Sequence, residues 1–192
     1  MLAERAEAQN FLAAGNINRA SARHPIRQEV SMDPRAIFGI SILMSLVSST
    51  VIAKLYVWPW LKAKQRDQAL TALVAPHMFL RFLGLSFLVT GVVAPSLPAG
   101  FAVPTAWGDF IAGILAIIAT IGLSGRASWA IAAVWVFSVW GAADLLLAFY
   151  NGPHFQLHPG ALGAAFYLPT AIVPLLLVSH VLAFRLLLRP AQ

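Results

Sequence analysis

The sequence contains five long apolar runs, separated by short segments that carry most of its charge and its turn-forming residues. A helix rises about 1.5 Å per residue, so about 20 apolar residues cross the hydrocarbon core of a bilayer. The runs alternate too little, and are too long, for the strands of a membrane barrel. The sequence therefore predicts an all-α polytopic integral membrane protein, a bundle of five transmembrane helices, with spans at residues 36–57, 76–94, 107–123, 128–150 and 162–184.

The composition supports this class of protein. Residues of the set AVILMFWYC make up 59% of the 192 residues and charged residues only 10%, whereas soluble domains carry about 25% charged residues. So few charges cannot cover a surface that faces water, which excludes a soluble globular enzyme, a coiled coil and a disordered chain. The sequence has no cysteine, so disulfides, thiolate metal sites and cysteine nucleophiles are excluded as well.

The basic residues predict how the spans are oriented. From Met32 onward, eight Lys and Arg residues fall on one side of the spans and only Arg35 falls on the other. The positive-inside rule places the first side in the cytoplasm, which gives an N-out, C-in topology in a bacterial-type inner membrane. The rule accounts for the net charge of +6 without nucleic acid, so the expected partner is the lipid bilayer. The eight residues are Lys54, Lys62, Lys64, Arg66, Arg81, Arg126, Arg185 and Arg189.

Residues 1–31 differ from the rest because they are polar and contain no long apolar run. They lack the apolar core of a signal peptide, so we expect either a disordered tail or a segment upstream of the true start, Met32. The second alternative has a specific basis. Residues 28–30, Gln-Glu-Val, can be encoded by CAG-GAG-GTN, which contains the bacterial ribosome-binding sequence AGGAGG. A single five-helix transmembrane domain then covers residues 32–192.

Two carboxylates inside the spans are the first candidates for a functional site. An ionisable side chain at the bilayer centre costs at least about 2.5–3.5 kcal/mol and usually faces the protein interior. Asp144 has no basic residue within a helical turn, which favours a neutral carboxyl that can exchange a proton. Asp109 is expected in the first turn of the third span, on a face with a stripe of small residues. Both are candidate proton- or cation-binding groups. The structural alternatives are helix capping by Asp109 and interhelical hydrogen bonding by Asp144.

The histidines suggest two further sites. On the expected cytoplasmic side, His77 and Arg81 share a helical face, and His180 is predicted at a similar depth. These three residues are candidates to bind a b-type haem, with Arg81 at a propionate, or anionic lipid headgroups. In the outer loop, His154 and His158 are candidates for a divalent-metal site with the two aspartates. The prolines that flank this pair do not favour the helix on which their spacing would suit one metal.

The motifs of common enzymes are missing from the spans. None carries a metalloprotease, P-loop or nucleophile-elbow pattern. We therefore expect a protein that is not an enzyme but a subunit or scaffold of a membrane assembly, with other subunits or further copies of itself as partners. The first alternative is a proton- or cation-coupled carrier or pore for a small solute, which uses Asp144 and Asp109. The second is an electron-transfer subunit with b-type haem or quinone at His77 and His180. Apart from such a haem or a divalent metal, no cofactor is expected.

Overall fold

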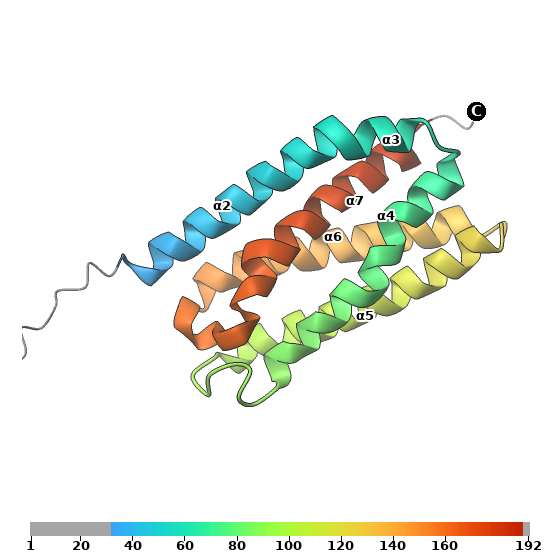
Figure 1. Cartoon of the computed structure of the whole chain (residues 1–192). Helices are drawn as coiled ribbons and strands as arrows, with labels where there is room; N and C mark the ends of the chain where they lie inside the picture. Colours follow the sequence, from blue (N-terminus) through green and yellow to red (C-terminus); the bar gives the residue numbers. More distant parts are fainter. Residues whose placement is uncertain (1–31, 190–192) are drawn as a thin grey trace, which may run out of the picture. The chain divides into compact units, whose positions relative to one another are not determined.

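A computed structural model describes residues 32–189 of the chain. Helices make up most of this region, and five helical segments are long and apolar enough to cross a membrane (Figure 1). They are Pro34–Lys62, Arg66–Leu88, Ala99–Ser124, Ala130–His154 and Leu168–Leu187. The prediction of an all-α fold with five helices of membrane-spanning length is confirmed. The expected polar tail, residues 1–31, lies outside the described residues.

Several segments combine more than one kind of helix. The first consists of α2 (Pro34–Ile52), the π-helical turn η1 (Ala53–Val57) and α3 (Trp58–Lys62). The second joins α4 (Arg66–Leu80) to the 3-10 helix η2 (Arg81–Leu88). The third and fourth are the single helices α5 (Ala99–Ser124) and α6 (Ala130–His154). After the 3-10 helix η3 (Pro159–Phe166), the last segment joins the π-helical turn η4 (Leu168–Ile172) to α7 (Val173–Leu187).

Two segments begin earlier than expected. Each continues through a proline that we expected at or before the start of its helix. Pro76 does not begin the second span, since α4 begins at Arg66 and continues through this proline. Likewise, α5 begins at Ala99 and contains Pro104. A proline inside a helix removes one backbone hydrogen bond, and neighbouring helices in a membrane bundle compensate for this loss. Both segments therefore start about two to three turns before the predicted spans.

The last segment begins later than expected, at Leu168. Gly163 interrupts the chain with φ 51° and ψ −130°, a combination that only glycine adopts readily. A Cβ added to Gly163 would overlap the backbone carbonyl of Val92, so a side chain here would strike the neighbouring turn. The chain then enters η4 and α7, where Pro169 and Pro174 each lie in the first turn of their own helical segment.

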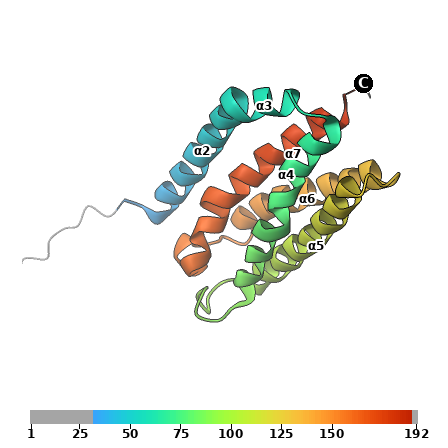
Figure 2. The same ribbon diagram turned by 45° about the vertical axis from the view of Figure 1, so that its right-hand side comes forward.

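The segments pack so that α5 contacts α4, η2 and α6, while α7 contacts α2, α4 and α6 (Figure 1, Figure 2). Two apolar cores fill the interior. The leucine-rich core joins residues of α4, α5, α6 and α7 near α3, and the phenylalanine core joins η2, α5, η3 and η4. Polar side chains of the candidate site lie between these cores along the helices. The leucine-rich core includes Leu70, Val74, Ala116, Val134 and Leu186, and the phenylalanine core includes Phe87, Phe101, Ala106 and Leu162.

Candidate functional site

Arg81 lies at the junction of α4 and η2, and its side chain is fully buried. Nη1 donates to Oδ1 of Asp109 at 2.6 Å and to Oδ2 of Asp144 at 2.9 Å. Nη2 donates to the carbonyl oxygen of Gly141 at 2.7 Å and to Nε2 of His180 at 3.1 Å. Four of the five guanidinium donors therefore have partners. These bonds offset the cost of burying the charges. We call Arg81, Asp109 and Asp144 the charged cluster.

Three glycines make space for the charged cluster. Gly84 of η2 and Gly108 of α5 each lie against one aspartate carboxyl, and Gly141 of α6 lies against Arg81. A Cβ at any of these positions would overlap the polar atoms beside it. Glycine therefore lets the backbones of three helices approach the charged side chains closely, as small residues do in membrane bundles.

The helix boundaries place Asp109 deeper in its segment than predicted. It lies ten residues after Ala99, the first residue of α5, or about 15 Å along the helix. A carboxyl at this depth cannot cap the helix N-terminus, so the expectation of a first-turn capping residue is wrong. Asp109 lies among the buried small residues Ala112, Gly113 and Ala116, on the face expected for it. Its carboxylate pairs with Arg81, an interaction that the sequence pattern does not predict.

Asp144 also has a charged partner, contrary to the expectation of an unpaired carboxyl. Its partner is Arg81, which is 63 residues earlier in the chain and on a different helix. Helical periodicity identifies neighbours on one helix only, and for this reason it misses the pair. A signal was nevertheless present in the sequence. One basic and two acidic side chains within apolar spans, each within three residues of a glycine, favour pairing with one another over burial alone.

His77, Arg81 and His180 lie together but are buried, with exposed fractions of 1%, 0% and 1%. They do not reach the surface, so they cannot contact lipid headgroups in this structure. The two imidazole rings lie 4.7 Å apart between centroids, and Phe137 packs against both at 5.0 Å. A haem with two axial histidines places its macrocycle between the rings. The observed contact leaves no space for one, so this geometry does not fit a haem held between His77 and His180.

The hydrogen bonds define the roles of the two imidazoles. Arginine only donates, so Nε2 of His180 accepts from Arg81 and the ring carries its proton on Nδ1. Ser179 uses its hydroxyl proton on the carbonyl oxygen of Leu176 at 2.7 Å. Nε2 of His77 therefore donates to Oγ of Ser179 at 2.6 Å. The imidazoles are hydrogen-bonding groups on the side of the cluster nearer the leucine-rich core, and His180 fixes the guanidinium of Arg81.

The candidate metal site of His154 and His158 with the two aspartates is not formed. His154 ends α6 and stacks on Tyr150 with ring centroids 5.9 Å apart. Nδ1 of His158 accepts from the backbone nitrogen of Gly160 at 3.2 Å. Within residues 32–189, no three His, Asp or Glu side chains come together in a way that could bind a metal ion. The two aspartates instead face Arg81.

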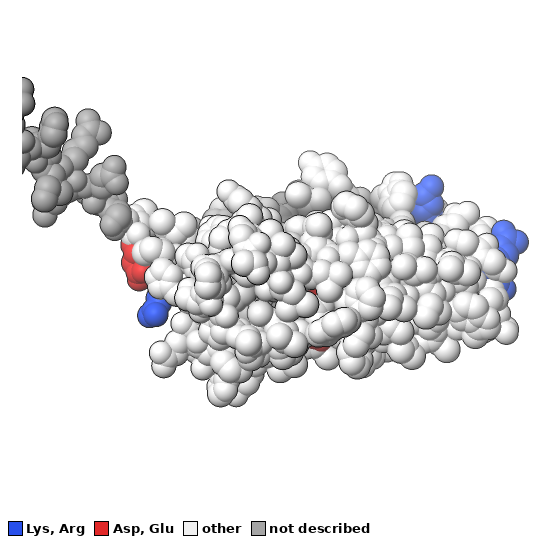
Figure 3. Space-filling model, turned by 90° about the horizontal axis from the view of Figure 1, so that it is seen from below, with Lys and Arg blue, Asp and Glu red and all other residues white. Residues whose placement is uncertain are grey.

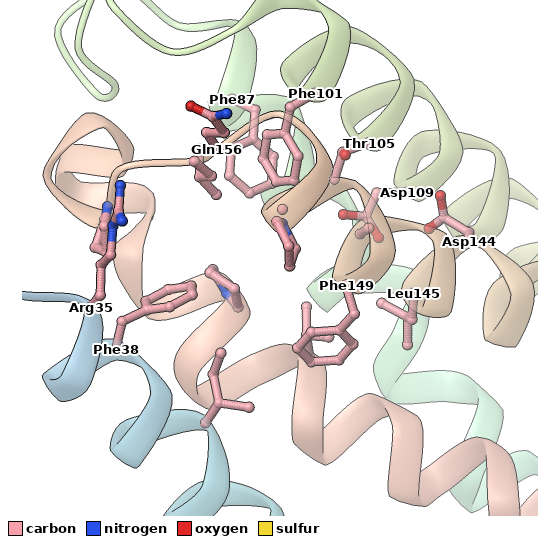
Figure 4. A pocket seen from close by; sticks show the side chains of 18 residues that line it. Arg35, Phe38, Phe87, Phe101, Thr105, Asp109, Asp144, Leu145, Phe149 and Gln156 are labelled. Carbon is pink, nitrogen blue, oxygen red and sulfur yellow. The ribbon is translucent and has the colours of Figure 1, made fainter.

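A pocket of about 480 Å³ adjoins the charged cluster and is lined by residues of all five segments. Figure 4 shows Asp109 and Asp144 at one end of the lining and Arg35 at the other. Arg81 is not part of the lining, so the carboxylates separate it from the pocket. The aromatic walls of the pocket are formed by four phenylalanines, Phe38, Phe87, Phe101 and Phe149. The sequence does not predict them, because nothing in an apolar chain distinguishes these four from the other phenylalanines among its 12.

No curated protein and no solved structure matches the chain. One family model does match, over residues 37–188, a range that contains every residue of the charged cluster and the three glycines beside it. Its description is "Domain of unknown function (DUF8737)". Because the match extends over most of the sequence, the chain belongs to this family.

Proposed function

We propose that the protein is a multi-pass protein of a bacterial-type inner membrane, with the start of α2 outside and the end of α7 in the cytoplasm. Of the eight basic residues assigned to the cytoplasmic side, only Arg81 is fully buried, so it carries no information on orientation. The other seven support the proposed orientation. The positive-inside rule therefore favours the same topology. Figure 3 shows a face that is largely uncharged along its middle, with Lys and Arg at its right-hand end and both basic and acidic side chains at its left-hand end, as a membrane-embedded surface requires.

We further propose that the protein is not an enzyme but a proton- or cation-coupled carrier or pore for a small solute, one that also passes protons through Asp109 and Asp144 when no solute is present. One observation supports this most directly: the carboxylates of Asp109 and Asp144 line the same pocket while sharing a single arginine. A pocket of this size, apolar except for a few converging polar groups, is typical of small-molecule sites. The roles of a subunit or scaffold and of a homo-oligomer stay predictions, since the residues described do not test them.

The charge of the cluster explains why a cation is needed. Two ionised carboxylates and one guanidinium give a formal charge of −1. An uncompensated charge inside a membrane protein is costly, so one more positive charge stabilises the site. The side chains of Asp109 and Asp144 are 11% and 10% exposed, whereas the side chain of Arg81 is 0% exposed. A proton or another cation can therefore reach the carboxylates from the pocket without displacing Arg81.

The two ends of the bundle differ, as a carrier in one of its states requires. The pocket extends from the charged cluster toward Arg35, near the start of α2. On the opposite side of the cluster, the leucine-rich core fills the interior with fully buried residues such as Leu70, Val74 and Val134. Access is thus from the proposed outside. Irregular helix accompanies the site, since η2 begins at Arg81 and η4 contains the pocket residue Pro169.

A flux measurement tests the coupling. Proteoliposomes that contain a pH-sensitive dye are given a potassium and valinomycin potential that drives protons inward. Wild-type protein should acidify the lumen faster than protein-free vesicles do. Asp144→Asn and Asp109→Asn should reduce the rate to background, because each removes the excess negative charge while keeping a hydrogen-bond acceptor for Arg81. The matched control is Asp67→Asn, at the exposed start of α4. Wild-type flux at background, or unchanged flux in both variants, would contradict the proposal.

A further inference from the structure

The polar atoms at the deep end of the pocket include one more acceptor besides the two carboxylates. Thr105 lines the pocket one helical turn before Asp109 on α5, and Figure 4 shows it beside that aspartate. It is 7% exposed, and its Oγ1 has no hydrogen-bond partner among residues 32–189. A buried hydroxyl without a partner is unfavourable, so such an atom in a pocket indicates a ligand that hydrogen-bonds to it. A hydroxyl can accept as well as donate, and ionised carboxylates only accept, so a ligand that donates can satisfy all three groups.

We infer that the ligand is a small hydrophobic ammonium ion, an aryl or alkyl group carrying a protonated amine. This inference rests on the proposed function and names the class of solute. An ammonium group has one positive charge and several N–H donors. The deep end of the pocket offers an excess of one negative charge, two carboxylates and the hydroxyl of Thr105. The charge and the hydrogen-bonding groups are therefore both complementary to an ammonium head.

The walls of the pocket match the apolar part of such a molecule. Phe38 of α2, Phe87 of η2, Phe101 of α5 and Phe149 of α6 line it from four segments. Burial of an aryl or alkyl group among these rings is favourable, and aromatic faces also attract cations. A volume of about 480 Å³ accommodates an amine with one aromatic ring. A hydrated metal ion would find few oxygen ligands on these walls.

The position of Arg35 gives the bound molecule a direction. Arg35 is exposed and lies at the end of the pocket lining opposite the aspartates. Its charge repels an ammonium group, while the charged cluster attracts one. The ammonium end should therefore lie at Asp109 and Asp144 with the apolar end toward the mouth. For the same reason an organic anion of similar size should be excluded from the deep end.

Equilibrium binding of three matched probes to the purified full chain tests this inference. The probes are phenethylammonium, its neutral isostere 2-phenylethanol and the anion 3-phenylpropionate, measured by isothermal titration calorimetry in detergent. Wild-type protein should bind the ammonium at least about tenfold more tightly than the alcohol, since bonds to charged groups are stronger than neutral ones. The carboxylate should bind most weakly. Equal affinity for ammonium and alcohol, or no binding of the ammonium, would overturn the inference.

Two variants separate the charge from the shape of the pocket. Asp144→Asn or Asp109→Asn leaves one carboxylate and one guanidinium, so the formal charge of the cluster becomes zero. Affinity for phenethylammonium should fall to that of 2-phenylethanol, whereas affinity for the alcohol itself should persist and show that the pocket is intact. Asp67→Asn should bind all three probes as wild type does. A retained preference for the ammonium in both cluster variants would overturn the inference. If either variant misfolds, the ratio of wild-type affinities for phenethylammonium and 2-phenylethanol decides whether the inference holds. Failure of this test leaves the proton-flux result untouched, so it is distinguishable from failure of the carrier function.

Discussion

Gly141→Ala should destabilise the protein because the added methyl group would occupy space that the charged cluster uses. A Cβ at this position would lie 2.6 Å from Nε2 of His180 and 2.9 Å from Nη2 of Arg81. Neither atom can move away freely, since Nη2 is bonded to Nε2 of His180 and to the carbonyl oxygen of Gly141. The variant must therefore break or lengthen at least one bond to a charged group.

The expected loss follows from these contacts. Overpacking costs about 1–3 kcal/mol, and a hydrogen bond to a charged group contributes about 1.5–3 kcal/mol. Against this loss, replacing glycine by alanine inside a helix raises the free energy of unfolding by up to about 1 kcal/mol, because alanine has the higher helix propensity. We expect the free energy of unfolding to fall by about 3 kcal/mol for Gly141→Ala, measured by SDS titration with circular dichroism.

Gly39→Ala is the matched control for this measurement. Gly39 lies within α2, and a methyl group added there would have no atom within 4 Å, so the same change tests helix propensity alone. It should leave stability unchanged or raise it slightly. If the two variants unfolded at the same SDS concentration, the close packing of Gly141 against the charged cluster would be refuted.

Two further substitutions test the cluster and the last turn of the fold. Arg81→Met should cost about 3–5 kcal/mol in the same titration, and more than Arg81→Lys, because it leaves two buried carboxylates without a cation. An Arg81→Met variant as stable as wild type would show that the pairs do not form. Gly163→Ala should lower the melting temperature, since φ 51° with ψ −130° costs a non-glycine residue about 1–3 kcal/mol. Gly152→Ala is its control, because a methyl group added there would have no atom within 4 Å. Equal melting temperatures for the two variants would contradict the backbone strain expected of Gly163→Ala.

The fold class was predictable from the sequence because the hydrophobic signal of each span is long and uninterrupted. The helix ends were not, since prolines at 76 and 104 were expected at or before helix starts and instead lie inside α4 and α5. In a soluble protein an internal proline usually ends a helix. In a membrane bundle, packing against neighbouring helices makes one lost hydrogen bond tolerable.

These boundary errors also account for what was missed at the site. With a span starting at Pro76, Arg81 falls one turn from the membrane surface and resembles an orientation signal. With α4 starting at Arg66, it lies 15 residues into the segment and needs a partner there. Asp109 and Asp144 were identified correctly as interior residues, but their shared partner depends on tertiary packing. Neither helical periodicity nor composition determines which helices are neighbours.

The central claim is that the carboxylates of Asp109 and Asp144 give a pocket open to the outside a net negative charge. Because the chain has no cysteine, a single one can report on this directly. Ala148→Cys places a thiol in the pocket lining, one turn beyond Asp144, and Ser96→Cys places one on an exposed turn that does not line it. The rates of modification by cationic and anionic methanethiosulfonates, added to the outside, are compared between the two variants.

Normalised to Ser96→Cys, the thiol of Ala148→Cys should react at least about tenfold faster with the cationic reagent, because a charged cleft concentrates ions of opposite sign. Added phenethylammonium should slow this reaction. A thiol at position 148 that is unreactive to both reagents from outside, or that reacts equally fast with both, would contradict the account.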